Sequence, residues 1–236
     1  MLFVASLALL TGQAGSELAG DVSTPPLTDI LDRMSRSEES RAQALRFYTS
    51  TRTYHLHNQR FRKTAEMTVR FNYRHPGRKD FVVMSQSGSA IVNQRVLRRM
   101  METEVEASQE ALRRLHRITA DNYDFRFLRR DSTDGRPVYV LDAAPKGKSK
   151  YLLRGEVWVD TADFAVAKVV GRPGANPSIW VRDSRFVYRF GKFGPFWLPL
   201  STDSEADALI FGHTEVKIQY GGYEISPSPG DGTDGK

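Results

Sequence analysis

Cysteine is absent from this chain of 236 residues. Its absence excludes disulfides, thiolate metal sites and a cysteine nucleophile, and we also expect no lipid-modified N-terminal cysteine. The chain contains no apolar run of the roughly 20 residues that a membrane-spanning helix needs. Its most apolar stretch, MLFVASLALL at residues 1–10, is much shorter. The sequence therefore predicts a protein that folds in water.

Motifs for covalent catalysis are missing as well. The string nearest to a Gly-x-Ser-x-Gly nucleophile elbow is SQSGSA at residues 85–90, and it lacks the first glycine. Residues 230–235 match the letters of a dinucleotide-binding fingerprint, but no predicted strand and helix flank them. Asp160 and Asp163 fall in a predicted turn, where carboxylates bond the local backbone. We expect no enzyme activity and no cofactor.

Histidine is scarce, with five in the chain. His55 and His57 share one face of a predicted strand, which is the spacing of two ligands to one metal ion. Structural zinc sites use four protein ligands and catalytic zinc sites use three, and no third ligand lies nearby in the sequence. We interpret the pair as a solvated strand edge and predict no metal site.

Positive charge is in excess, with a formal net charge of +6. Such a charge suits phosphate-bearing partners, although basic side chains spread over solvated strand faces give the same total. Arg126, Arg129 and Arg130 lie beside Phe125 and Phe127, as in surfaces that bind nucleic acid. Because the two aromatic residues alternate inward and export would remove the usual nucleic acids, we predict no nucleic-acid partner.

Both ends of the chain differ from its middle. Residues 1–15 match the apolar core and small-residue cleavage zone of a secretory signal peptide. We expect cleavage near Ala14 and a periplasmic protein. Residues 226–236 form a polar string rich in proline and glycine that we expect to be disordered. The remaining residues, 24–225, fit one folded domain.

Two stretches have the spacing of amphipathic helices. The first covers residues 27–45, with Thr24 as the predicted cap and proline at the entrance. The second covers residues 96–117, where glutamates oppose arginines across the polar side. Arg98, Arg99, Arg113 and Arg114 on this second stretch suit either an anionic membrane surface or a salt-bridged helix face.

From Thr53 onward the hydrophobic period is two, most clearly where Met67, Val69, Phe71 and Tyr73 alternate with polar residues. The connections are too short for parallel crossovers, so we predict an antiparallel, meandering sheet of about ten strands. The strand segments with this pattern are 67–73, 80–86, 123–129, 137–143, 151–159, 164–170, 179–190, 197–201, 208–219 and 223–225. The fold class is therefore α+β.

A sheet of this size curls, and its apolar face must be covered. Two helices cover the rim of a half-barrel more readily than they fill its middle, so we predict an apolar hollow. Its expected wall comprises Met67, Val69, Phe71, Tyr73, Phe125, Phe127, Phe186, Tyr188, Val216 and Ile218. Its expected lid comprises Ile30, Leu31, Met34, Leu97, Met100 and Met101. Ordinary core packing is the alternative for every one of these residues.

Four segments carry a family resemblance: NYDFRFL at 122–128, GRPVYVLDAAPKGKSKYLLRGEVWVD at 135–160, FGPFWLP at 193–199 and IFGHTEVKIQYGGYEI at 210–225. Together they resemble the LolA/LolB-like superfamily of bacterial outer-membrane lipoprotein-sorting proteins, over about residues 27–225. The resemblance implies an unclosed antiparallel half-barrel, covered by helices, that carries lipoprotein acyl chains. Family members hold the lid with a strand arginine, but the sequence does not identify which arginine here matches it.

The leading hypothesis is a periplasmic carrier or chaperone that shields the acyl chains of a lipoprotein or lipid without any covalent step. Peripheral contact with an anionic membrane belongs to this hypothesis. The alternative is an envelope-stress sensor or scaffold of the same fold that binds an envelope protein and has a solidly packed interior.

Overall fold

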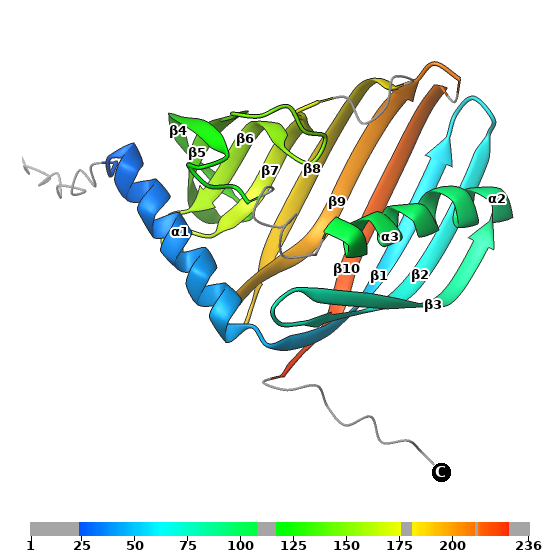
Figure 1. The fold of residues 1–236 in the computed structure, drawn as a ribbon, viewed down its shortest axis with the longest axis horizontal. Coiled ribbons are helices and arrows are strands. Elements are labelled where there is room, and N and C mark those ends of the chain that lie inside the picture. Colours follow the sequence, from blue (N-terminus) through cyan, green and yellow to red (C-terminus); the bar gives the residue numbers. More distant parts are fainter. Residues whose placement is uncertain (1–23, 108–116, 176–180, 211, 227–236) are drawn as a thin grey trace, which may run out of the picture.

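The computed structural model describes residues 24–107, 117–175, 181–210 and 212–226. Over these residues one antiparallel sheet of ten strands forms, in the order β3-β2-β1-β10-β9-β8-β7-β6-β5-β4. The sheet is curved and unclosed, with β3 and β4 as its two edges (Figure 1). The strands are β1 (Phe47–Asn58), β2 (Lys63–Arg74), β3 (Arg78–Gly88), β4 (Tyr123–Thr133), β5 (Arg136–Pro145), β6 (Leu153–Asp160), β7 (Val166–Pro173), β8 (Val181–Phe193), β9 (Phe196–Ala208) and β10 (Gly212–Ser226).

The predicted α+β class and antiparallel half-barrel are confirmed, but several strand boundaries differ from the prediction. β1 begins at Phe47, six residues before the predicted change of period. The predicted strand 208–219 starts too early, since Ala208 still belongs to β9. Its remainder and the predicted strand 223–225 are one strand, β10, because the chain continues through a bulge opposite Thr49 and Thr51. Gly222 at this bulge has a φ of +57°, which glycine adopts without strain. The additional strand β1 and the joining of the two C-terminal segments into β10 offset each other, so the structure has ten strands, as predicted.

Helix α1 (Leu27–Ala44) covers one end of the sheet. It begins directly after Pro26, and Thr24 does not cap it, because no side chain bonds its first turn. Ile30 and Met34 are buried against an apolar cluster from β4 to β8 that includes Leu141 and Val157. The 3.6-residue spacing thus produces the stripe that packs on the sheet.

The second helix covers the other end and starts earlier than predicted, at Ala90 instead of Val96. It comprises α2 (Ala90–Val92), a π-helical turn (Asn93–Leu97) and α3 (Arg98–Ala107). The buried Asn93 amide donates a hydrogen bond to the carbonyl oxygen of Ser87, which fixes the helix to the end of β3. The predicted continuation to residue 117 falls mostly outside the described residues, as do the predicted signal peptide and nearly all of the polar tail.

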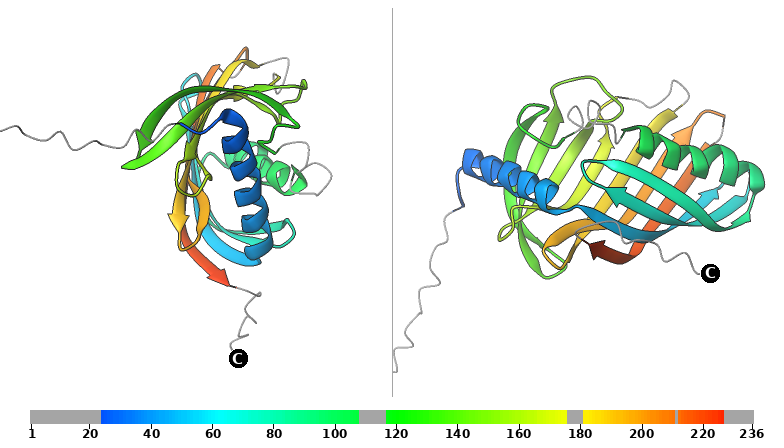
Figure 2. Two further views of the ribbon diagram at one scale, coloured as in Figure 1. Left: turned by 90° about the vertical axis from the view of Figure 1, so that its left-hand side faces the viewer. Right: turned by 60° about the horizontal axis from the view of Figure 1, so that its bottom comes forward.

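Both helices lie on the same, concave side of the sheet (Figure 2). Burial alternates strictly along β1, where every second residue is buried from Tyr48 to Asn58. The period of two therefore separates an inner face, which the helices partly cover, from an outer face that is largely polar. No helix among the described residues is both long and apolar enough to cross a membrane.

Candidate ligand-binding face

The inner face carries one apolar cluster under each helix, with β9 between these two, and a third cluster around Tyr48 and Phe71 that includes Leu198 of β9. The cluster under α3 joins Leu97 and Met101 to Met67, Val69 and other residues of β1, β2 and β10. The cluster under α1 draws on β4 to β8. Among the described residues, β9 contributes no side chain to either cluster.

The middle of the inner face has small side chains on β9. Thr202 lies opposite both Tyr188 of β8 and Ile218 of β10, and Ser204 lies opposite Phe186 and Val216. Paired residues in an antiparallel sheet share a face, so all six side chains face the same hollow side. The Ser204 hydroxyl donates to the carbonyl oxygen of Val216, at 3.3 Å. We call Phe186, Tyr188, Thr202 and Ser204 the central floor.

Tyr188 is accessible on the central floor. The residue keeps 37% of its surface accessible and stacks on Phe186 with ring centroids 4.6 Å apart. Burial among surrounding atoms, followed by the charge of Glu104, nevertheless raises the pKa of the Tyr188 hydroxyl to about 12.

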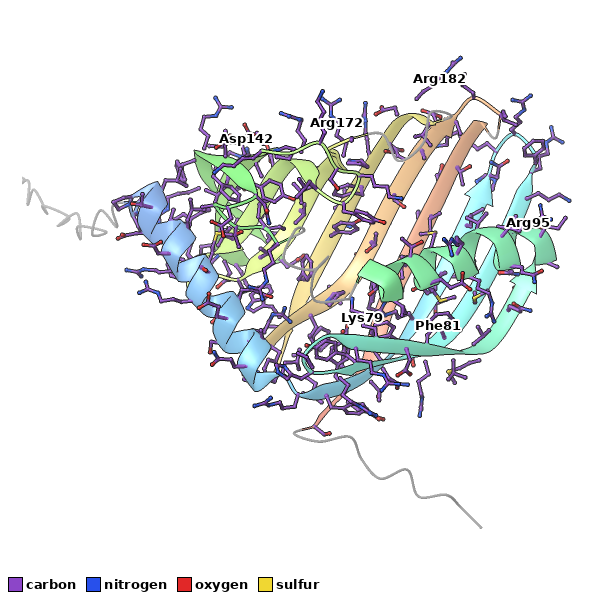
Figure 3. All side chains as sticks on the ribbon, in the orientation of Figure 1. Lys79, Phe81, Arg95, Asp142, Arg172 and Arg182 are labelled. Carbon is purple, nitrogen blue, oxygen red and sulfur yellow. The ribbon has the colours of Figure 1, made fainter. Side chains whose placement is uncertain are left out.

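A polar cluster fastens α3 to the sheet near this floor. Arg52 of β1 is only 2% exposed, and its Nη1 donates to Glu104 Oε2 of α3 at 2.7 Å. Lys79 Nζ of β3 donates to the other carboxylate oxygen, Glu104 Oε1, at 2.9 Å. Lys79 lies on β3 next to α3 in Figure 3. We call Arg52, Lys79 and Glu104 the latch.

The latch is held in its charged form. Burial alone would raise the pKa of Glu104, but the charges of Lys79 and Arg52 outweigh burial and lower it to about 2. Burial lowers the pKa of Arg52, while Glu104 and the neighbouring tyrosines raise it by more. The Arg52 guanidinium also lies over the ring of Phe71, 3.2 Å from its centroid. At neutral pH the latch therefore consists of one carboxylate between two cations.

All of the predicted wall and lid residues lie on the inner face or on the covering helices, but they separate into packed groups. Met67, Val69, Val216 and Ile218 pack with Leu97, Met100 and Met101. Phe71 and Tyr73 pack with Tyr48 and Leu45. Phe125 and Phe127 pack with Ile30, Leu31 and Met34. Phe186 packs against the cluster under α1 and stacks on Tyr188 at the central floor.

Sequence reasoning missed the latch. A signal was present, since Ser50 and Arg52 occupy the inward phase of β1 between Tyr48 and Tyr54. A charged side chain at an inward position needs a partner, because an unpaired buried charge is costly. The partner, Glu104, is 52 residues away on a helix whose glutamates all resembled a solvated face.

Other polar groups named from the sequence have structural partners. The Asp160 carboxylate accepts hydrogen bonds from Arg136 and from the backbone N–H groups of Ala162 and Asp163, as expected for a turn. His55 lies 3.0 Å from Glu66 beside a hollow of about 340 Å³ that His57 also lines. Within the described ranges, no three histidine, aspartate or glutamate side chains come close enough to hold a metal ion.

The arginines considered for nucleic acid or membrane have mixed surroundings. Arg126 pairs with Asp142 and Arg129 with Glu156, on the exposed side of the sheet. On α3, Arg98 is exposed and Arg99 lies 3.4 Å from Glu102, so this part is a partly salt-bridged helix face. The other two helix arginines, at 113 and 114, lie outside the described residues.

No protein-family model matches the chain, and no curated protein matches it. Similar solved structures include a DUF1329 family protein from Desulfovibrio piger, with TM-score 0.45, 10% identity and coverage of 88% of this chain and 96% of that one. An outer-membrane lipoprotein-sorting protein domain from Vibrio parahaemolyticus has TM-score 0.42, 13% identity and coverage of 84% and 93%. A LolA superfamily protein from Nitrosomonas europaea has TM-score 0.40, 10% identity and coverage of 87% and 96%.

Proteins of the superfamily that the sequence resembles are among these structural neighbours. Identities and TM-scores this low carry no statement about ligand or activity.

Proposed function

We propose that this chain is a periplasmic carrier that holds the acyl chains of a lipoprotein or lipid against the central floor, without covalent chemistry. The observation that carries the proposal is the central floor on the concave side of the sheet, where Tyr188 keeps 37% of its surface accessible and β9 places the small side chains of Thr202 and Ser204. An acyl chain placed there would lie against the exposed faces of Phe186 and Tyr188. Burial of each CH₂ group contributes about 0.8 kcal/mol, so a long chain supplies ample binding free energy.

The surroundings of the floor suit a flexible hydrocarbon. Met67, Met100 and Met101 belong to the neighbouring cluster, and methionine side chains adapt to irregular ligands. The small side chains of Thr202 and Ser204 leave space above β9. Both hydroxyls have hydrogen-bond partners within the sheet, to Tyr220 and to Val216, so covering them with hydrocarbon leaves neither unsatisfied.

The attachment of α3 supports a lid that opens. Its apolar contact with the sheet depends mainly on Leu97 and Met101, while its far end depends on the latch. The hydrogen bonds of an ion pair can be replaced by hydrogen bonds to water or to polar groups of a ligand. An apolar contact has no equivalent replacement. Movement of α3 away from the sheet would widen the access of a chain to the floor.

Contact with a membrane is the second element of the proposal. The β1–β2 and β9–β10 hairpin tips lie together, because Gln59 N–H donates to the carbonyl oxygen of His213 and Arg60 to that of Leu209. Phe61, Leu209 and Ile210 are exposed there. Arg182 lies at the same end of the sheet (Figure 3).

Charge at the hairpin tips complements an anionic lipid surface. Arg60, Arg62 and Lys63 are exposed, and no carboxylate of the described residues lies within ion-pair distance of them. Apolar tips flanked by cations combine hydrophobic insertion with electrostatic attraction to anionic headgroups. This surface suits a membrane better than the partly paired arginines of α3 do.

The carrier proposal is tested by filling the floor. Ser204→Phe places a ring on the central floor, and Glu205→Phe places the same ring on the outer face of the same strand, one residue away. We expect Ser204→Phe to abolish binding of a fluorescent fatty acid and Glu205→Phe to leave it unchanged, with both variants folded by circular dichroism. Equal binding in both variants contradicts the proposal.

Native mass spectrometry of protein taken from its host separates the carrier from the scaffold. A carrier retains lipid mass, whereas a protein-binding scaffold retains a polypeptide and no lipid. N-terminal sequencing of the same sample tests export, since recovery of Met1 contradicts cleavage near Ala14.

A further inference from the structure

The latch carries a surplus of positive charge inside the hollow. Two cations, Arg52 and Lys79, share the single carboxylate of Glu104. Among the residues described by the structure, no second carboxylate pairs with either cation. The nearby Arg41 is already matched by Glu38, with which it forms two hydrogen bonds. The two cations of the latch therefore carry more charge than the one carboxylate of Glu104 neutralises.

Two buried donors next to the latch have no partner among the described residues. Arg52 uses Nη1 for Glu104, but its Nε–H makes no hydrogen bond, and neither does the hydroxyl of Ser50. Both residues are 2% exposed and point inward from β1, two positions apart. Buried polar groups are nearly always paired in native proteins, so an unpaired donor pair next to a surplus charge marks a site for an acceptor.

The third observation is the apolar wall that adjoins these donors. The Arg52 guanidinium lies over Phe71, at 3.2 Å, and near Tyr220, at 5.0 Å from its centroid. The Tyr220 hydroxyl in turn lies 3.2 Å from the hydroxyl of Thr202, so this wall reaches the central floor, and the charge of Glu104 raises the pKa of Tyr188. An acceptor at this position would have its charge on Arg52 and its remaining atoms beside aromatic rings. A ligand that combines an anionic head with a hydrocarbon chain, an amphiphile, matches both the cation and the aromatic rings.

We propose that the latch is an anion-binding subsite and that Glu104 is its built-in occupant. Its ligand is an amphiphile with a carboxylate or phosphate head, which replaces Glu104 on Arg52 and Lys79 while the hydrocarbon enters the central floor. This inference rests on the proposed carrier function and adds the chemical class of the head. The ligand head accepts from Arg52 Nε and Ser50 as well, which Glu104 does not do in the closed form.

Exchange explains why opening and loading coincide. Glu104 belongs to α3, so a head that takes its place on the two cations releases the far end of the helix. The released helix uncovers the floor for the chain of the same ligand. An uncharged lipid cannot displace Glu104, so α3 stays bound to Arg52 and Lys79 and the lipid binds more weakly.

The experiment compares three probes by isothermal titration calorimetry on the full chain. Hexadecanoate has the anionic head and the chain, methyl hexadecanoate has the chain alone, and inorganic phosphate has the anion alone. We expect the wild type to bind hexadecanoate at least about tenfold more tightly than the ester. Glu104→Gln should raise the affinity for hexadecanoate by about tenfold and that for the ester much less.

Two further variants separate the subsite from a merely loosened helix. Glu102→Gln removes a carboxylate from the same helix at an exposed ion pair and should change neither affinity. Lys79→Gln removes one cation from the edge strand and should weaken hexadecanoate without affecting the ester. Arg52→Lys keeps the charge but lacks the Nε donor, and should also lower the preference for the acid.

Each outcome has one reading. Equal gains for acid and ester in Glu104→Gln overturn the subsite, because Glu104 then acts only as a fastener. Equal affinities of the wild type for acid and ester overturn it as well and leave the carrier standing. If phosphate binds in a way that depends on Arg52 but neither hexadecanoate nor its ester binds, the anion site is supported and the carrier function is contradicted. Failure of all three probes contradicts both.

Discussion

Replacement of Glu104 by glutamine removes the charge that joins α3 to Arg52 and Lys79. A pKa lowered from 4.5 to about 2 corresponds to at most about 3 kcal/mol of folding free energy. Because the Glu104 side chain is 34% exposed, solvent screening reduces this contribution to about 1–2 kcal/mol. The variant also leaves the buried Arg52 charge without its carboxylate, which adds to the cost. We expect Glu104→Gln to lower the free energy of unfolding at pH 7 by about 2 kcal/mol.

The pH dependence has a definite sign. The folded-state pKa of Glu104 lies below its unfolded value, so its stabilisation is complete above about pH 4.5 and is lost as the pH falls toward about 2. Urea denaturation of both proteins between pH 7 and pH 3 measures this. The difference between wild type and Glu104→Gln should shrink below pH 4.5. A difference that stays constant with pH, or one no larger than for Glu102→Gln, refutes the reasoning.

Further predictions concern packing, the turn and the hairpin tips. Leu97→Ala should lower stability by about 2–5 kcal/mol in urea denaturation, because Leu97 is fully buried, whereas the exposed Ile91→Ala should stay within about 0.5 kcal/mol. Asp160→Asn should lower it by about 1–3 kcal/mol through loss of a buried charged acceptor, and an unchanged midpoint contradicts that role. Phe61→Ser combined with Ile210→Ser should reduce co-sedimentation with vesicles containing phosphatidylglycerol, and undiminished sedimentation contradicts the membrane surface.

The strands with clean alternation were predictable from the sequence. Met67 to Tyr73 alternates strongly, and β2 contains all of it. β9 was cut short at Ser201, although it continues to Ala208. Its second half carries acidic residues outward and small residues inward, so it has no apolar face to reveal the period. The same small residues form the central floor, and the least visible strand is thus the one that shapes the candidate site.

The start of the second helix and the latch escaped prediction for different reasons. SQSGSA at residues 85–90 has turn composition, and the helix begins inside it without a side-chain cap. Arg52 and Glu104 meet only because the helix crosses the sheet, and such a pairing has no local signature. Composition and hydrophobic period indicate which face of the sheet is the inner one. Which polar groups meet on that face depends on where the helix crosses the sheet.

The most direct test of the account is a nuclear Overhauser measurement between a ¹³C-labelled hexadecanoyl chain and the protein. We predict contacts from the chain methylenes to the rings of Phe186 and Tyr188 and to the methyl group of Thr202. Contacts confined to outer-face side chains such as Val187 and Lys217, or no contacts with a bound chain on the inner face, would contradict it.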